Sequence, residues 1–111
     1  MRELTDIKAI YVVHAKWCPH CHPTTVEPME KVAKELGVSF FSYDIDFPDQ
    51  EAKADELVSK YGDWSEDYLI PQIFVETKDW KIRHVFTGYS ESVDSTKRHL
   101  NNLISSPLFA R

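Results

Sequence analysis

Residues 7–21 read IKAIYVVHAKWCPHC and decide how this chain folds. The first nine are mostly apolar and rich in β-branched side chains, which is typical of a strand buried on both faces. Beyond the two cysteines, apolar residues recur at helical spacing, at Val26, Met29, Val32, Ala33 and Leu36. Gly37 is well placed to end that helix. The segment therefore predicts a buried strand, a short turn with two cysteines, and a helix from about Pro19 to Leu36.

The rest of the chain alternates between strand-like and helical patterns. Residues 38–45, 73–75 and 82–87 have the β-branched and aromatic content of strands. A helix opened by Pro48 and ended by Gly62, and a last helix over residues 93–104, complete the order β-α-β-α-β-β-α. This order predicts an α/β fold, with a mixed four-stranded sheet and helices on both faces. We expect one domain over residues 1–111, with its core at about 7–105.

Composition narrows the classes of function. Of 111 residues, 42% are hydrophobic and 28% charged, and the net charge is −5, which argues against a nucleic-acid partner. No apolar run is long enough to cross a membrane, so we expect no membrane partner. Residues 1–6 lack the apolar segment of a signal peptide, which favours a cytoplasmic protein. A chain whose leader had been removed would have the same appearance.

The two cysteines, Cys18 and Cys21, are too close in sequence to connect distant segments. Their value must therefore be chemical. At the start of a helix, free N–H groups and the helix dipole should lower the pKa of Cys18, while the more buried Cys21 should keep a higher pKa. This asymmetry predicts that Cys18 attacks a substrate disulfide and that Cys21 resolves the mixed disulfide.

Three features resemble the thioredoxin superfamily over about residues 7–105. The first is Trp17-Cys18-Pro19-His20-Cys21, in which an aromatic residue precedes the cysteine pair. The second is Ile70-Pro71 at the head of the third predicted strand, and the third is Gly88 after the last. The resemblance implies a thioredoxin-like fold in which Pro71 follows a cis peptide bond and faces the cysteines.

The resemblance also implies an enzyme that exchanges protein disulfides and dithiols as a monomer and works with an upstream redox partner, with the net direction of electron flow left open. No prosthetic group or metal is needed for that reaction. The expected catalytic residues are Cys18, Cys21 and His20. The residues expected to shape the substrate groove are Trp17, Pro19, Ile70, Pro71 and Gly88.

Within the superfamily the match is mixed. The Pro19-His20 pair is that of the periplasmic oxidant DsbA, whereas the run from Ile70 to Val75 is similar to glutaredoxins. Val12 and Ser42 stand where thioredoxins carry a buried aspartate and its companion lysine, so we expect a different proton path, through water or His22. Gly88-Tyr89-Ser90 stands where glutaredoxins carry a Gly-Gly pair. A glutaredoxin-like enzyme with glutathione as co-substrate stays the close alternative.

His20 lies between the cysteines, where an imidazolium could donate to the Cys18 sulfur. Stabilising the thiolate favours the reduced protein, so we expect a couple more oxidising than that of thioredoxin. The alternative to redox chemistry is a binding module, either an adaptor or a site for a metal or cluster that uses Cys18, His20, Cys21 and His22. Four ligands within five residues cannot easily surround one ion, which favours the redox interpretation.

The remaining polar and aromatic residues are assigned simpler roles. His14, His84 and His99 are expected to be strand or surface residues. The loop over residues 63–69 leads directly into Pro71 and should border the active-site groove, where Trp64 and Tyr68 could contact a partner peptide.

Overall fold

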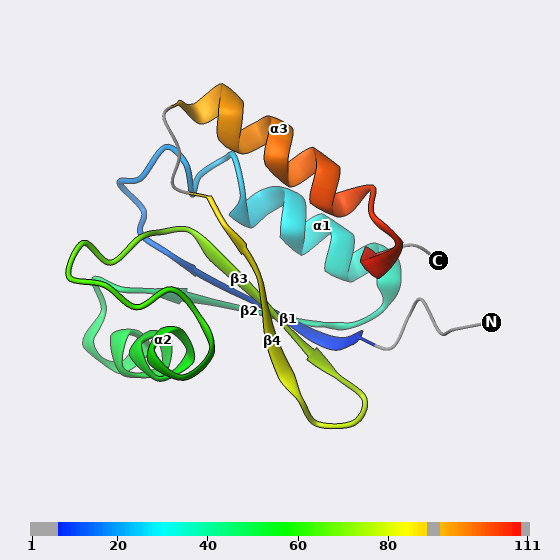
Figure 1. Cartoon of the computed structure of the whole chain (residues 1–111), viewed down its shortest axis with the longest axis horizontal. Coiled ribbons are helices and arrows are strands. Elements are labelled where there is room, and N and C mark those ends of the chain that lie inside the picture. Colours follow the sequence, from blue (N-terminus) through cyan, green and yellow to red (C-terminus); the bar gives the residue numbers. More distant parts are fainter. Residues whose placement is uncertain (1–6, 89–91, 110–111) are drawn as a thin grey trace.

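The predicted buried strand is β1 (Ile7–His14), which lies in the interior of a four-stranded sheet (Figure 1). β2 (Ser39–Asp44) pairs with it in parallel, and β3 (Gln72–Thr77) pairs with its other edge in antiparallel fashion. β4 (Ile82–Thr87) is antiparallel to β3, which gives the strand order β2-β1-β3-β4. The predicted α/β class with a mixed four-stranded sheet is confirmed.

The computed structural model describes residues 7–88 and 92–109. Tyr89 and Ser90, on which the comparison with glutaredoxins depended, therefore lie outside the described residues. Within the described ranges, none of the helices has the length and apolar character needed to cross a membrane.

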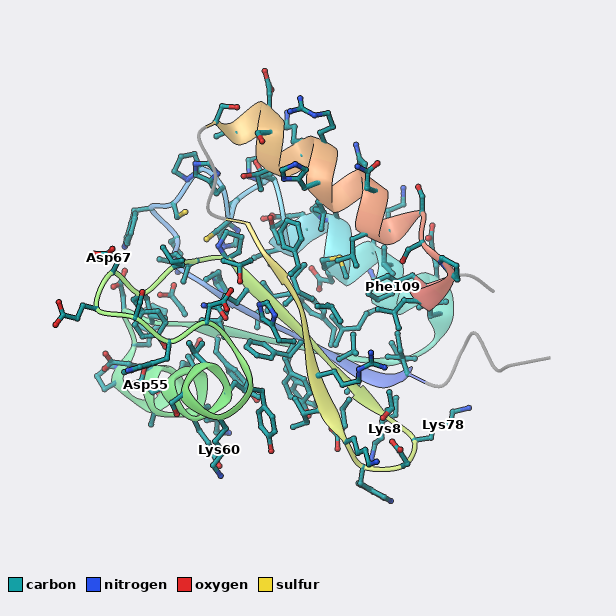
Figure 2. All side chains as sticks on the ribbon, in the orientation of Figure 1. Lys8, Asp55, Lys60, Asp67, Lys78 and Phe109 are labelled. Atoms are coloured by element: carbon teal, nitrogen blue, oxygen red, sulfur yellow. The ribbon has the colours of Figure 1, made fainter. Side chains whose placement is uncertain are left out.

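Among the described residues, three α-helices cover the two faces of the sheet. α1 (Val26–Leu36) and α3 (Val93–Ile104) lie side by side on one face, and α2 (Pro48–Tyr61) covers the other (Figure 1). A short 3-10 helix, Pro107–Phe109, follows α3. Figure 2 shows Phe109 at the C-terminal end of this layer, next to the end of α1. The predicted placement of helices on both faces is thus present in the structure.

Each face of the sheet has its own apolar core. The core on the α1 and α3 face comprises Ile7, Ile10, Val12, Val26, Met29, Val32, Ala33, Ile73, Val75, Phe86, Leu100 and Phe109. The core on the α2 face comprises Val13, Ala15, Cys18, Cys21, Ala54, Leu57, Val58, Ile70 and Phe74. Both cysteines therefore pack with the α2 core, although the chain continues from them into α1.

The predicted helix start at Pro19 is wrong, because α1 begins at Val26. Pro23 has no N–H to donate back to the Pro19 carbonyl, so the helical hydrogen-bond series is interrupted there. Side chains replace the missing donors: Thr24 Oγ1 donates to the Pro19 carbonyl oxygen at 2.8 Å, and Thr25 Oγ1 donates to the His20 carbonyl oxygen at 2.7 Å. The cysteines consequently lie on a separate turn ahead of α1.

Candidate active site

Cys18 and Cys21 form a single tight turn directly after β1. The backbone N–H groups of Cys21 and His22 both donate to the Cys18 carbonyl oxygen, at 3.0 and 3.1 Å. Cys18 and Cys21 lie 3.3 Å apart, and their side chains are joined by a hydrogen bond. Cys18 is 6% exposed and Cys21 is fully buried, which confirms the predicted difference in burial. Because disulfide sulfurs are about 2.05 Å apart, only a small movement separates this arrangement from a bond.

The surroundings of Cys21 disfavour its thiolate. Burial raises the pKa of the Cys21 thiol, and the hydrogen bond and charge of Cys18, together with the charge of Asp44, add to the rise. A hydrogen bond from the Ala15 backbone opposes this effect without cancelling it. Cys21 therefore holds its proton under ordinary conditions and must lose it before it can attack another sulfur.

A pocket of about 430 Å³ opens beside Cys18. It is lined by Trp17, Cys18, Pro19, His20, Asp67, Tyr68, Leu69 and Ile70. The structure therefore brings together five of the eight predicted site residues, and the loop before β3 borders them as predicted. Asp67 points outward from that loop in Figure 2.

Aromatic side chains frame this pocket. Trp17 is 67% exposed, and its indole Nε1 donates to Asp46 Oδ2 at 2.8 Å, which fixes the orientation of the ring. Tyr68 donates its hydroxyl to Asp55 Oδ1 at 2.6 Å and contacts Trp64 edge-on. Trp64 is not among the residues that line the pocket, so its predicted contact with a partner peptide stays a prediction.

Pro71 and Gly88 lie next to each other, just beyond the pocket lining. The Ile70–Pro71 peptide bond is cis, as the resemblance implied. The Gly88 N–H donates to the Pro71 carbonyl oxygen at 2.8 Å, and a Cβ at Gly88 would lie 2.8 Å from both Pro71 Cγ and Phe86 Cε2. Only glycine allows this close approach, so Gly88 supports the Pro71 segment by its lack of a side chain.

His20 is held by Thr96, a residue that no sequence motif identifies. Its Nδ1 lies 2.7 Å from Thr96 Oγ1, in the first turns of α3. The Thr96 hydroxyl donates to the Gly88 carbonyl oxygen, so it accepts its hydrogen bond from His20 Nδ1–H. These two hydrogen bonds connect the cysteine turn to α3 and to the Pro71 segment. They also place a proton on Nδ1 of His20.

A second polar cluster lies at the same end of β1. His14 is 5% exposed, and its Nδ1 lies 2.9 Å from Nε2 of His22. The Nδ1 of His22 lies 2.9 Å from Glu27 Oε2. His14 is a strand residue, as expected, because it is the last residue of β1. It is also a buried member of a series of hydrogen-bonded side chains, which was not expected. No spacing rule connects residues 14, 22 and 27, so no sequence motif predicts this cluster.

His14 should make stability depend on pH. Burial lowers the pKa of His14, with His22 and Lys16 adding to the effect against the opposing charges of Asp44 and Glu27. Below about pH 6.5, His14 therefore binds a proton more readily in the unfolded chain than in the folded one. The free energy of unfolding should rise with pH up to about 6.5 and fall as the pH drops below that value. Urea unfolding at several pH values checks this, with His14→Asn as the control. A slope as steep in the variant would contradict the prediction.

Metal binding has no support among the side chains described. Across residues 7–88 and 92–109, no group of three or more His, Cys, Asp or Glu side chains is arranged to hold a metal ion. His22, one of the four candidate ligands, is engaged with His14 and Glu27.

Comparison with known proteins returns nothing similar: no family model, no curated protein and no solved structure matches this chain.

Proposed function

We propose that this protein is a thiol–disulfide oxidoreductase of thioredoxin-like fold, which acts on protein disulfides and dithiols through Cys18 and Cys21. The carrying observation is the contact between these two side chains at 3.3 Å, with unequal burial, beside an open pocket. Two structural cysteines would have no reason to border a groove lined by an exposed tryptophan. The strand order and the cis bond at Pro71 support the thioredoxin-like assignment.

The proposed reaction divides between the two thiols. The Cys18 thiolate attacks one sulfur of a substrate disulfide, forms a mixed disulfide and releases the other sulfur as a thiolate. Cys21 then loses its proton and attacks the Cys18 sulfur, which releases the second substrate thiolate and leaves a Cys18–Cys21 disulfide. The substrate gains two electrons and the protein loses two. An upstream reductant completes the cycle.

The pocket supplies the position for the substrate. Ile70 lines it beside Cys18, and Pro71 has no N–H of its own, so the adjacent backbone is suited to pair with an extended substrate segment. Trp17 and Tyr68 provide apolar area on either side, and Asp67 adds negative charge. These features favour a peptide rather than a small disulfide as the preferred substrate.

The test is reduction of insulin disulfides with dithiothreitol as electron donor, combined with a redox titration of the Cys18–Cys21 couple. We expect catalytic turnover and a reversible two-electron transition. A chain that forms no Cys18–Cys21 disulfide at any potential would overturn the proposal. Running the assay with glutathione and glutathione reductase, and separately with thioredoxin reductase, distinguishes a glutaredoxin-like enzyme from a thioredoxin-like one.

His20 is proposed to tune the potential of this couple. We expect His20→Pro to make the couple more reducing, because a ring that could donate a hydrogen bond to the Cys18 sulfur is lost. Thr96→Val should shift the potential in the same direction by about 30 mV, since it removes the hydrogen bond that holds the His20 ring, worth about 1.4 kcal/mol. Equilibration with glutathione buffers measures both. Unchanged potentials in the two variants would refute the tuning role, and Ser95→Ala, which leaves His20 and Thr96 in place, is the control.

A further inference from the structure

The His14 side chain has one ring nitrogen that none of the interactions described above accounts for. His14 Nε2 is buried and has no hydrogen-bond partner among the described residues. The other ring nitrogen, Nδ1, is engaged with His22, which continues to Glu27. His22 is partly exposed and the Glu27 side chain is 53% exposed. This series of hydrogen bonds therefore leads from the exposed Glu27 carboxylate, through the imidazole rings of His22 and His14, to the buried Nε2 of His14.

The positions of the protons on His14, His22 and Glu27 show how these side chains can transfer a proton. Burial raises the pKa of the Glu27 carboxyl, but the hydrogen bond with His22 leads the effects that lower it overall. Glu27 Oε2 is therefore a carboxylate oxygen, and the hydrogen bond between the two side chains is donated by His22 Nδ1–H. The 2.9 Å separation between His22 and His14 has room for one proton. With both rings neutral, that proton sits on His14 Nδ1 and leaves Nε2 bare. If Nε2 gains a proton, the shared proton moves to His22.

The positive charge thus ends on His22, next to the Glu27 carboxylate, although the proton entered at His14. Both rings cannot be cationic together, because two protons would then face each other across 2.9 Å. The three hydrogen-bonded side chains thus take up one proton at buried His14 and carry the positive charge on His22. Solvent can then remove a proton from His22, which is partly exposed.

Cys21 is the group that needs such an acceptor. Its thiol must be deprotonated for the resolving attack, and burial makes that costly. The hydrogen-bonded His14, His22 and Glu27 are next to Cys21 in the sequence: Ala15, whose backbone hydrogen-bonds to the Cys21 thiol, directly follows His14, and His22 directly follows Cys21. Asp44 is paired with His14 in register across β1 and β2, and its charge acts on both His14 and Cys21.

We propose that His14, His22 and Glu27 form a proton relay that accepts the proton of the Cys21 thiol during resolution of the mixed disulfide. The proton leaves Cys21 Sγ for His14 Nε2, the shared proton passes to His22, and the new thiolate attacks Cys18. The bond between Cys18 and the substrate sulfur breaks, and the substrate leaves as a thiolate. This relay rests on the proposed function. It takes the place of the buried aspartate and the lysine that thioredoxins carry at the positions of Val12 and Ser42.

The relay should work only while it is neutral. The groups that face His14 are His22 and Lys16 from the cysteine turn, Asp44 from β2 and Glu27 from α1. Asp44 and Glu27 favour a charged His14, while burial, His22 and Lys16 disfavour it, with the balance toward the neutral ring. Resolution should therefore be assisted near neutral pH, and the assistance should vanish as acid protonates the pair.

The experiment is rapid mixing of the reduced protein with the chromogenic disulfide dithiobis-nitrobenzoate. Cys18 attack releases a first thionitrobenzoate, and resolution by Cys21 releases a second. His14→Asn keeps a side-chain N–H for His22 but removes Nε2, so we expect the second phase to slow by about tenfold or more while the first is unchanged. Glu27→Gln, at an exposed position, should slow the second phase by a smaller factor. Glu30→Gln, on the same helix, is the control.

The outcomes separate the relay from the proposed function. If the wild-type protein releases no second thionitrobenzoate by Cys21 attack, the dithiol function itself fails. If it does, but His14→Asn and Glu27→Gln leave the second phase unchanged between about pH 6 and about pH 8, the relay is refuted. The ratio of wild-type to His14→Asn rates should fall toward unity as pH decreases, which a merely structural role of His14 would not produce. Near-ultraviolet circular dichroism confirms that each variant is folded.

Discussion

Replacing Cys18 by serine should abolish disulfide exchange, whereas replacing Cys21 by serine should stop the reaction one step later. Cys18 is the thiol at the pocket, and a serine hydroxyl does not ionise to a comparable nucleophile. In Cys21→Ser the first attack still proceeds, but no thiol remains to release the mixed disulfide. Insulin turnover should therefore be lost in both variants, and only Cys21→Ser should retain a bound substrate.

Mass spectrometry of the protein after incubation with a disulfide-containing peptide checks this difference. Cys21→Ser should carry the peptide on Cys18 and release it with dithiothreitol, while Cys18→Ser should remain unmodified. Because Cys21 is fully buried and Cys18 is not, the order of the two steps follows from access to the pocket. Peptide attached to Cys21 in Cys18→Ser, at the wild-type rate, would contradict the assigned roles.

The strands and most helix ends were predictable because they depend on local patterns. β4 spans Ile82–Thr87 and α3 spans Val93–Ile104, as their apolar periodicity indicated. α2 likewise runs from Pro48 to the residue before Gly62. The error at α1 arose because apolar spacing continues smoothly into the turn, while the interruption depends on the missing N–H of Pro23 and on two threonine hydroxyls that stand in as donors.

The candidate site was predictable only where it is contiguous in sequence. The cysteine turn and the Ile70–Pro71 pair were found, since each is a short motif. Thr96 was missed because it lies 76 residues from His20, and only the packing of α3 brings the two side chains together. His14 was missed because a buried histidine at the end of a strand has the same appearance in sequence as an exposed one. Hydrogen bonds between residues far apart in the sequence produce no repeating sequence pattern from which they could be predicted.

Gln72, at the start of β3, is a further residue that no local pattern identified. It is fully buried, and its amide Nε2 donates to the backbone carbonyl oxygens of Asp63 and Leu69, at 3.1 and 2.8 Å. Its Oε1 accepts from the Asp63 N–H at 3.0 Å. A Cβ at Gly62 would overlap this oxygen, so the glycine makes room for the amide. The Gln72 side chain thereby holds both ends of the loop that lines the pocket, at Asp63 and at Leu69, against the start of β3.

Gln72→Met should therefore lower the free energy of unfolding by about 3 kcal/mol, since it keeps the side-chain length but removes three hydrogen bonds of about 1 kcal/mol each. Urea denaturation measures the change. Gln50→Met is the matched control: Gln50 makes one hydrogen bond to a backbone N–H, at Asp44, and should lose about 1 kcal/mol. Equal losses in the two variants would show that the loop does not depend on Gln72.

The same substitution should affect catalysis through the pocket rather than through the thiols. Asp67, Tyr68 and Leu69 lie between the two ends that Gln72 holds, and they line the pocket beside Cys18. With the loop released, the KM for a protein substrate should rise, while the reaction of Cys18 with a small disulfide should keep its rate. A loop that binds substrate needs a rigid attachment, and here a single buried amide in the adjacent strand provides it.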